Sequence, residues 1–332
     1  MRRPAAIVAC TLSVLLAAAG CGGGSQHNTA RQSAGSRSTA SASPAQPSNS
    51  PQASGHPAAL PAVSGSYGSK PHLRFSAGTA PRGLAKKVLL AGHGPVVRKG
   101  DLLVADYLGQ VWGGKVFDNS YDRHAPAGFP IGVGAVIPGW DKTLVGVRTG
   151  SRLLLSIPPK QGYGPQGNPQ AGIKGTDTLV FVVDVIRAYG KNAAGDPHAV
   201  RESRTGTGPT VTGALTRRPT VTIPKGAAQP KQEVTTVVAK GHGAPVHNGL
   251  VVMQYEAVEW SGKPLDSTWQ RGTPAGVPIG DGMQPTPFDT LKGIPVGSQV
   301  LLQLPGQQGK PAVAVAVDIV AEPETAAKTT HF

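Results

Sequence analysis

The sequence predicts an α+β protein that contains two copies of one small domain. Three observations lead to this prediction: alternating apolar segments typical of strands, one segment with helical spacing between them, and a repeat of the pattern 148 positions later. A chain of 332 residues has room for two domains of ordinary size. We therefore expect two antiparallel sheets, each with a short helix on its concave side.

Three segments have the alternation of strands. Residues 101–112 place Leu103, Ala105 and Tyr107 on one face, because successive side chains of a strand point to opposite faces. Residues 151–158 and 178–186 alternate in the same way, with apolar positions at Leu153, Leu155, Ile157, Leu179, Phe181, Val183 and Val185. We predict that all three lie in one antiparallel sheet.

A helical pattern lies between these strands. Trp140, Leu144 and Val147 recur at helical spacing from Gly139 onward, which predicts one short helix with an apolar face. The segment VIPGWDKTLVG thus places a tryptophan at the entrance of a helix, although aromatic residues make up only 5% of the chain. The position of the other aromatic residues should explain this tryptophan.

The repeat relates two segments of the chain. At an offset of 148, Tyr107 matches Tyr255, Trp112 matches Trp260, Asp118 matches Asp266 and Trp140 matches Phe288. Two regions poor in large apolar residues flank the copies, and such regions cannot bury a core. The predicted divisions are a signal peptide at 1–20, a flexible tether at 21–70, domains at 71–190 and 218–323, and a linker at 191–217.

The N-terminus predicts export. Arg2 and Arg3 precede an apolar run from Ala5 to Ala19, which has the order of a signal peptide and is too short to span a bilayer comfortably. The ending AAGC resembles a bacterial lipoprotein signal, in which Cys21 becomes the lipidated first residue. The alternative is an ordinary secretory peptide with an incidental cysteine.

Several kinds of chemistry are disfavoured. The only cysteines are Cys10 and Cys21, so no disulfide is expected in the domains. The nine histidines are isolated, and no phosphate loop or Gly-x-Ser-x-Gly elbow is present, so we expect no metal and no cofactor. The net charge of +14 is scattered without a basic helix, which favours acidic envelope polymers over nucleic acid as a partner.

The aromatic residues are concentrated in the first copy. Eight of the sixteen fall between Tyr107 and Phe181. Five of them come from different predicted elements and can converge, either as plain core or as a pocket: Tyr107, Phe117, Phe129, Trp140 and Phe181. Asp118 beside Phe117, and Tyr163 in a loop rich in Gly and Pro, favour the pocket.

Three motifs in this copy carry a family resemblance. DYLGQVWGGKVFDNSYDR, VIPGWDKTLVGVRTGSR and YGPQGNPQAGIKGTDTLVFVVDVI resemble the FKBP-type (immunophilin) peptidyl-prolyl cis-trans isomerases, over residues 85–187. The resemblance implies a twisted antiparallel sheet half-wrapped around a short α-helix, with a shallow apolar pocket floored by Trp140. It implies catalytic roles for Asp118, Tyr163, Trp140 and Phe181, and substrate-binding roles for Tyr107, Phe117, Phe129, Val136, Ile137 and Ile173.

The chemistry of such a pocket follows from the amide bond. Twisting an X-Pro amide means crossing a barrier of about 18–20 kcal/mol that comes from resonance. The planar amide is more dipolar than the twisted one, so an apolar pocket penalises the ground state more than the transition state. We expect the Tyr163 hydroxyl and the Ile137 N–H to donate to substrate carbonyls, and Asp118 to orient Tyr107 or face the twisted carbonyl.

Two positions depart from the family pattern. Ala127 and Asn168 replace an aromatic residue and a histidine that are common in the family, and both are expected at the pocket edge. The resemblance also implies macrolide immunophilin ligands, and we expect these departures to alter the preference for substrate or inhibitor.

The second copy has lost most of these features. It has Leu265 for Phe117 and Val277 for Phe129, and it lacks the loop that carries Tyr163 and Ile173. We interpret it as a degenerate, inactive copy kept for stability, spacing or binding of client chains.

The sequence therefore predicts an isomerase for proline-containing exported polypeptides, anchored by lipid to the outer face of a bacterial cell membrane. A secreted form is the alternative location. The alternative functions are a non-catalytic protein that binds client chains or a ligand in the same cleft and, third, a structural envelope protein.

Overall fold

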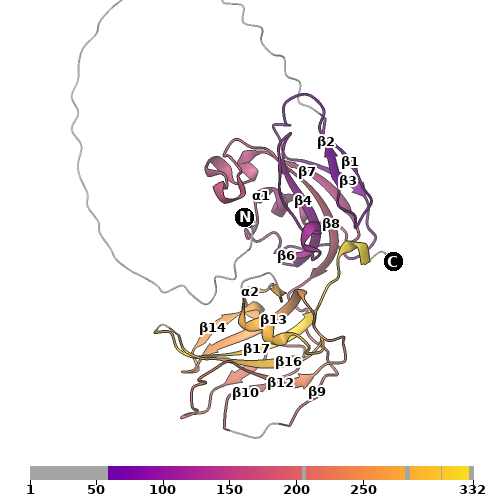
Figure 1. The fold of residues 1–332 in the computed structure, drawn as a ribbon. Coiled ribbons are helices and arrows are strands. Elements are labelled where there is room, and N and C mark those ends of the chain that lie inside the picture. The colour runs from indigo at the N-terminus through magenta and orange to yellow at the C-terminus, as the bar shows by residue number, and fades with distance from the viewer. Residues whose placement is uncertain (1–58, 204–206, 281–284, 308, 329–332) are drawn as a thin grey trace, which may run out of the picture.

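The protein contains two large β-sheets, one from each half of the chain (Figure 1). The structure is a computed structural model that describes residues 59–203, 207–280, 285–307 and 309–328. The predicted signal peptide with Cys21, and the tether up to residue 58, lie outside the described residues. In the described part, no helix is long and apolar enough to cross a membrane.

We call residues 59–189 the first unit. Its strands are β1 (Ala62–Ser64), β2 (His72–Arg74), β3 (Ala85–Leu90), β4 (Leu102–Val111), β5 (Val116–Asn119), β6 (Ala127–Pro130), β7 (Arg152–Ile157) and β8 (Leu179–Tyr189). Its helices are α1 (Pro138–Leu144) and the 3-10 turns η1 (Tyr121–Arg123), η2 (Pro159–Gln161), η3 (Gly164–Gln166) and η4 (Pro169–Ala171). The sheet has the antiparallel order β3-β7-β8-β4-β5, and β6 pairs with β4.

The first core forms on the sheet face that alternation predicts. Leu103, Ala105 and Tyr107 of β4 share one buried cluster with Trp140 and Leu144 of α1. The prediction of three strands and one helix between them is confirmed. The helix ends at Leu144 rather than at Val147, because the chain turns at Gly146 with a φ of 85°. Val147 is still buried, but it lies beyond the helix.

We call residues 199–321 the second unit. Its strands are β9 (Val200–Arg201), β10 (Thr210–Thr212), β11 (Thr220–Thr222), β12 (Val234–Lys240), β13 (Gly249–Glu259), β14 (Pro264–Ser267), β15 (Ala275–Ile279), β16 (Gln299–Leu304) and β17 (Val313–Ala321). Its helices are α2 (Thr268–Arg271) and η5 (Pro287–Leu291), and η6 (Ala326–Lys328) follows the unit. The order β14-β13-β17-β16-β12 matches that of the first sheet, with β15 on β13 and β9 on β12.

A short hairpin covers the outer face of each sheet. β1 pairs with β2, and β10 pairs with β11 in the same register 148 positions later, from Ala62 to Thr210. In the first unit, Val63 and Leu73 pack on Leu154 and Val182 of the sheet. Both hairpins begin within the predicted tether and linker, and their apolar residues at 60–75 and 209–223 pack on the sheets.

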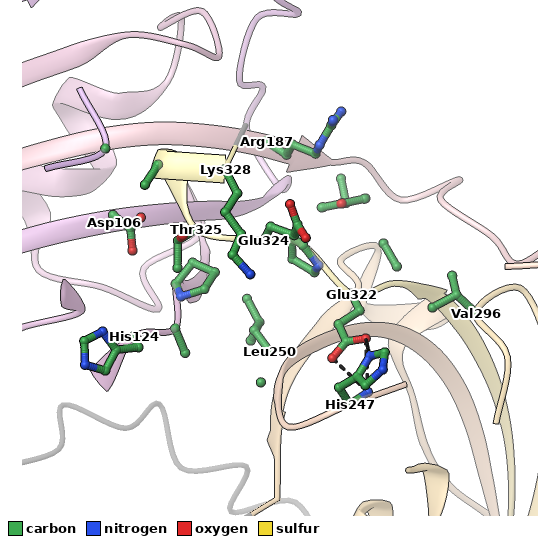
Figure 2. Close-up of a pocket in the computed structure, with 18 of the residues that line it drawn as sticks. Asp106, His124, Arg187, His247, Leu250, Val296, Glu322, Glu324, Thr325 and Lys328 are labelled. Atoms are coloured by element: carbon green, nitrogen blue, oxygen red, sulfur yellow. Dashed lines mark hydrogen bonds and ion pairs between the residues drawn. The ribbon is translucent and has the colours of Figure 1, made fainter. Parts of the chain in front are cut away.

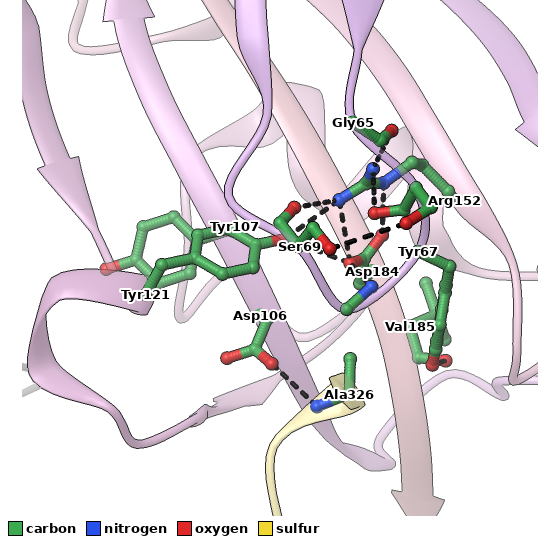
Figure 3. Close-up of polar contacts among 12 residues, drawn as sticks. Gly65, Tyr67, Ser69, Asp106, Tyr107, Tyr121, Arg152, Asp184, Val185 and Ala326 are labelled. Carbon is green, nitrogen blue, oxygen red and sulfur yellow. Dashed lines mark hydrogen bonds and ion pairs between the residues drawn. The ribbon is translucent and has the colours of Figure 1, made fainter. Parts of the chain in front are cut away.

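A buried ion pair fixes the first hairpin to its sheet (Figure 3). Arg152 Nε donates to Asp184 Oδ1 at 2.6 Å, and the same guanidinium donates to the Gly65 and Ser69 carbonyls at 2.5 and 2.7 Å. Gly68 N donates to Asp184 Oδ2 at 2.8 Å. Both charged side chains are almost fully buried, so these partners replace their lost hydration.

Candidate functional site

An apolar pocket of about 350 Å³ opens in the first unit between β4, β5, α1 and the loops before α1 and after η2. It is lined by Tyr107, Phe117, Asp118, Phe129, Ala135, Val136, Ile137, Pro138, Trp140, Gly162, Tyr163 and Phe181. Nine of the ten side chains predicted for the site are among them. The exception is Ile173, which is 3% exposed and belongs to the core beside the pocket.

Trp140 lies at the centre of the aromatic lining. Its ring centroid is 4.7 Å from that of Phe129, 5.3 Å from Phe181 and 5.7 Å from Tyr107, and all three contacts are edge-to-face. Such geometry is favourable for aromatic quadrupoles and fixes each ring. Gly139 brings α1 close to the sheet, because a Cβ there would lie 2.6 Å from Ile157 Cγ2. The glycine before the tryptophan thus allows α1 to pack closely against β7.

Phe117 and Phe181 form a second aromatic wall. Their ring centroids are 5.6 Å apart at an interplanar angle of 82°. Both rings lean over Gly109 of β4, whose missing side chain leaves the room that they occupy. A strand interior normally disfavours glycine, so this position reflects the packing of the wall.

A polar group closes one side of the pocket. The Tyr107 hydroxyl donates to Asp118 Oδ2, and Arg123 Nη1 lies 2.5 Å from Asp118 Oδ1. Arg123 Nη2 donates to the Tyr107 oxygen at 3.0 Å. Burial raises the pKa of Tyr107 well above its usual value, and the neighbouring Asp118 adds to this shift, so the hydroxyl stays a donor at neutral pH.

Sequence reasoning missed Arg123. It stands five residues after Asp118, and Arg271 stands five residues after Asp266 in the repeat. Inspection of the charged residues shared by both copies would have found it.

The loop before α1 brings a backbone donor to the pocket. Asp141 of α1 accepts from Gly132 N and Gly134 N, both at 2.7 Å, and so holds this loop against the helix. The loop ends at Ile137, whose N–H has no acceptor among the described residues. Tyr163 approaches from the far side, in the segment between η2 and η3, and packs against the first core.

The second unit repeats the polar group without the aromatic walls. Tyr255 donates to Asp266, and Arg271 donates to both, as in the first unit. Phe288 is 6.2 Å from Tyr255 in a tilted contact and takes the place of the tryptophan. Leu265 at the position of Phe117 is 37% exposed, so no ring closes this side.

The pocket of the first unit has a defined chemical character. Its walls are aromatic and aliphatic, and its one carboxylate is bonded to Arg123 and Tyr107. The donors among its lining residues are the Tyr107 and Tyr163 hydroxyls, the Ile137 backbone N–H and the Trp140 indole N–H. Asp118 is thereby occupied by hydrogen bonds, and no serine, threonine, cysteine, lysine or histidine lines the pocket. A lining of this kind has room for an apolar ring and offers hydrogen-bond donors to a polar group beside it.

Comparison with known proteins relates this pocket to one family. The FKBP-type peptidyl-prolyl cis-trans isomerase family matches residues 94–186. An FK506-binding protein of Streptomyces anulatus is 37% identical over 113 residues, which are 34% of this chain and 91% of that protein. The chloroplastic peptidyl-prolyl cis-trans isomerase FKBP13 of Arabidopsis thaliana is 44% identical over 113 residues, 32% of this chain and 53% of that protein.

A bacterial relative gives the same result. The FKBP-type isomerase FkpA of Escherichia coli K12 is 40% identical over 108 residues, 32% of this chain and 38% of that protein. The matching part thus spans about half of the plant relative and less of FkpA. The chain belongs to the FKBP-type peptidyl-prolyl cis-trans isomerases, a family of isomerases, as the Streptomyces relative is matched over nearly its whole length.

Proposed function

We propose that the first unit accelerates cis-trans isomerisation of Xaa-Pro bonds in exported polypeptides. The observation that carries this proposal is the Trp140 ring, 2% exposed and edge-to-face with three other rings, at the base of an apolar pocket. A rigid floor of this kind holds a proline ring at low entropic cost.

The mechanism needs no bond to the protein. The aromatic walls remove water from the amide, and the planar ground state loses more solvation than the twisted transition state. Trp140, Phe181, Phe117 and Phe129 hold the ring, with Val136 at the rim and Ile173 supporting from behind. The Ile137 N–H and the Tyr163 hydroxyl donate to substrate carbonyls, and Asp118 orients the Tyr107 hydroxyl.

The test is the isomerisation rate of a short Xaa-Pro peptide in the presence of the full chain. We expect acceleration that falls about tenfold or more in Trp140→Leu and in Asp118→Ala, because both remove transition-state contacts. Phe288→Leu, the equivalent change in the second unit, is the control and should keep the full rate. A folded wild-type chain that gives no acceleration would overturn the proposal.

The second unit and the ligands extend this proposal. The second unit is an inactive copy, since Leu265 and Val277 replace aromatic residues of the walls and the loop that carries Tyr163 and Ile173 has no counterpart. Macrolide immunophilin ligands should compete with proline peptides for the same pocket. A chain that binds a proline peptide in this pocket, with loss in Trp140→Leu but without acceleration, would favour the alternative of a client-binding protein.

The sequence around Cys21 supports a proposal for the location of the protein. We propose that Cys21 carries lipid and anchors the chain to the outer face of the bacterial membrane. Labelling of cells with a palmitate analogue should mark the wild type and not Cys21→Ser. Equal label in both would leave a secreted protein.

A further inference from the structure

The two units meet through equivalent residues. Gly128 of β6 and Gly276 of β15 are 148 positions apart, and a Cβ on either would lie within 3.4 Å of the other's Cα. Leu102 and Leu250, also equivalent, share one buried cluster between the units. Contacts between equivalent residues are the mark of a two-fold arrangement. The two units therefore pack as a pseudo-symmetric pair within one chain.

The segment after the second unit crosses to the first. We call residues 322–328 the C-terminal arm; it borders a cavity of about 1170 Å³ that both units line (Figure 2). Ala326 within this arm is fully buried, and its N–H donates to Asp106 Oδ2 of β4 at 2.7 Å (Figure 3). A Cβ on Gly68 would lie 2.6 Å from Ala327 Cα, so the arm fits tightly under the β1–β2 loop.

A second arm makes the reciprocal contact. Residues 190–193 follow β8 as the C-terminal arm follows β17. Gln254 Nε2 of β13 donates to the carbonyls of Lys191 and Ala193 at 3.0 and 3.1 Å. Gln254 stands 148 positions after Asp106. Each arm thus bonds to the residue directly before the tyrosine of the other unit's polar group.

The contact at Asp106 continues to the pocket. Asp106 is 1% exposed, and its Oδ1 accepts from Ser120 Oγ at 2.7 Å. Ser120 Oγ in turn accepts from Tyr107 N at 3.0 Å. The arm, Asp106, Ser120 and the backbone of Tyr107 therefore form one chain of hydrogen bonds. Without the arm, a buried carboxylate oxygen loses its donor and the local structure must adjust.

We propose that the C-terminal arm is a positioning element of the isomerase pocket, which holds Asp106 and Ser120 and so fixes the Tyr107 side. This inference rests on the proposed function. The inference also gives a role to the second unit, which lacks the aromatic walls, since the C-terminal arm follows directly after its last strand. Asp106 and Ser120 are positioning residues, because they act through Tyr107 and lie outside the pocket lining.

The test compares three variants of the full chain. These are a chain that ends at Pro323, Asp106→Ala, and Gln254→Ala, which breaks only the reciprocal arm. The value of kcat/KM is measured at a temperature at which circular dichroism shows each protein to be fully folded. We expect the first two to lose about tenfold and their combination to lose no more than either alone, because they break one contact.

The control defines what would overturn the inference. The kcat/KM of Gln254→Ala should stay within about twofold of the wild-type value, since Gln254 lies next to Tyr255 in the second unit and not at the pocket of the first. An equal loss of kcat/KM in Gln254→Ala would mean that any weakening of the contact between the two units lowers activity, which would overturn a specific role of the C-terminal arm. A fully active chain that ends at Pro323 would overturn it as well. If that truncation does not fold, Asp106→Asn replaces it, because it keeps the size of the side chain.

A separate measurement keeps this inference apart from the proposed function. If the wild type does not isomerise the peptide, the proposed function fails, and hydrogen exchange at the amides of Tyr107 and Ser120 decides about the arm. We expect faster exchange there in Asp106→Ala than in Gln254→Ala. Equal exchange in both variants would overturn the inference.

Discussion

Gly109 lies directly opposite Phe181 in the pairing of β4 with β8, and a Cβ on Gly109 would come within 2.8 Å of the Phe181 ring. The Phe117 ring would be even closer, at 2.6 Å. In the second unit the equivalent of this glycine is Ala257, which pairs with Val315. The unit with the glycine at this position has the larger side chains around it, and the unit with the alanine has a smaller one. The space beside this strand position is thus filled in both units, by different residues.

Replacement of Gly109 by alanine should therefore damage the pocket. The methyl group would push two rigid rings, and overpacking of this kind costs about 1–3 kcal/mol of unfolding free energy. We expect kcat/KM toward a proline peptide to fall by about tenfold or more, since the aromatic wall moves. The reverse change in the other unit, Ala257→Gly, should leave activity unchanged. Full activity of a folded Gly109→Ala protein would show that the wall adapts.

Arg123 should matter for activity although it lies at the pocket edge. Its guanidinium bonds to both Asp118 and Tyr107, and the Asp118 side chain is only 7% exposed. Arg123→Met leaves this carboxylate with one protein donor fewer, so the Tyr107 hydroxyl shifts. We expect a several-fold loss in kcat/KM by peptide assay, and no loss for Arg271→Met. Equal rates for all three proteins would count against a role for the polar group.

Most of the candidate site could be predicted from the sequence, because its residues lie in short segments with the period of a strand or a helix. Trp140, Phe117, Asp118 and Phe181 each lie within a short segment whose period fixes the side on which they point. Their convergence follows once the strands form one sheet. Ile173 lies in the core beside the lining, a distinction that the sequence does not make because irregular loops have no period that separates core from pocket.

Longer-range features escaped prediction. The hairpin at 62–74 has too few apolar residues to be separated from a polar tether until the Leu154 face that it covers is known. The bond from Ala326 to Asp106 joins residues 220 positions apart and has no local signature. Such contacts depend on the packing of the two units, which the pattern within one strand does not encode.

The ion pair between Arg152 and Asp184 should be essential for the first unit. Both groups are almost fully buried, and a broken buried pair typically costs about 3–5 kcal/mol, because one charge stays without its partner. We expect Asp184→Asn to lower the unfolding free energy by about this amount in urea titrations. The β1–β2 hairpin should also become sensitive to protease, since Arg152 holds it. Unchanged stability would mean that Gly68 and Tyr121 hold the hairpin without the charge.

The equivalent carboxyl of the second unit should behave in the opposite way. Asp318 pairs across the sheet with Gln254 and Gln299, so a glutamine stands where the first unit has Arg152. Gln299 Nε2 donates to Asp318 Oδ1 at 2.8 Å, whereas Asp318 Oδ2 and both glutamine carbonyls have no partner among the described residues. A protonated carboxyl would supply the missing donor. Burial raises the pKa of Asp318 to about 7, and the bond from Gln299 opposes this only in part.

The sign of the pH dependence follows from this shift. The pKa of Asp318 is higher in the folded than in the unfolded chain, where it is about 3.9. Its contribution to stability is therefore complete below that pH and is lost as the pH rises toward 7, by at most about 1.4 kcal/mol for each pH unit. Asp318→Asn keeps the donor without the charge. We expect it to raise the unfolding free energy relative to the wild type at pH 8 more than at pH 5, whereas Asp184→Asn lowers it at both. An equal difference between wild type and Asp318→Asn at both pH values would mean that Asp318 is ionised in the folded protein.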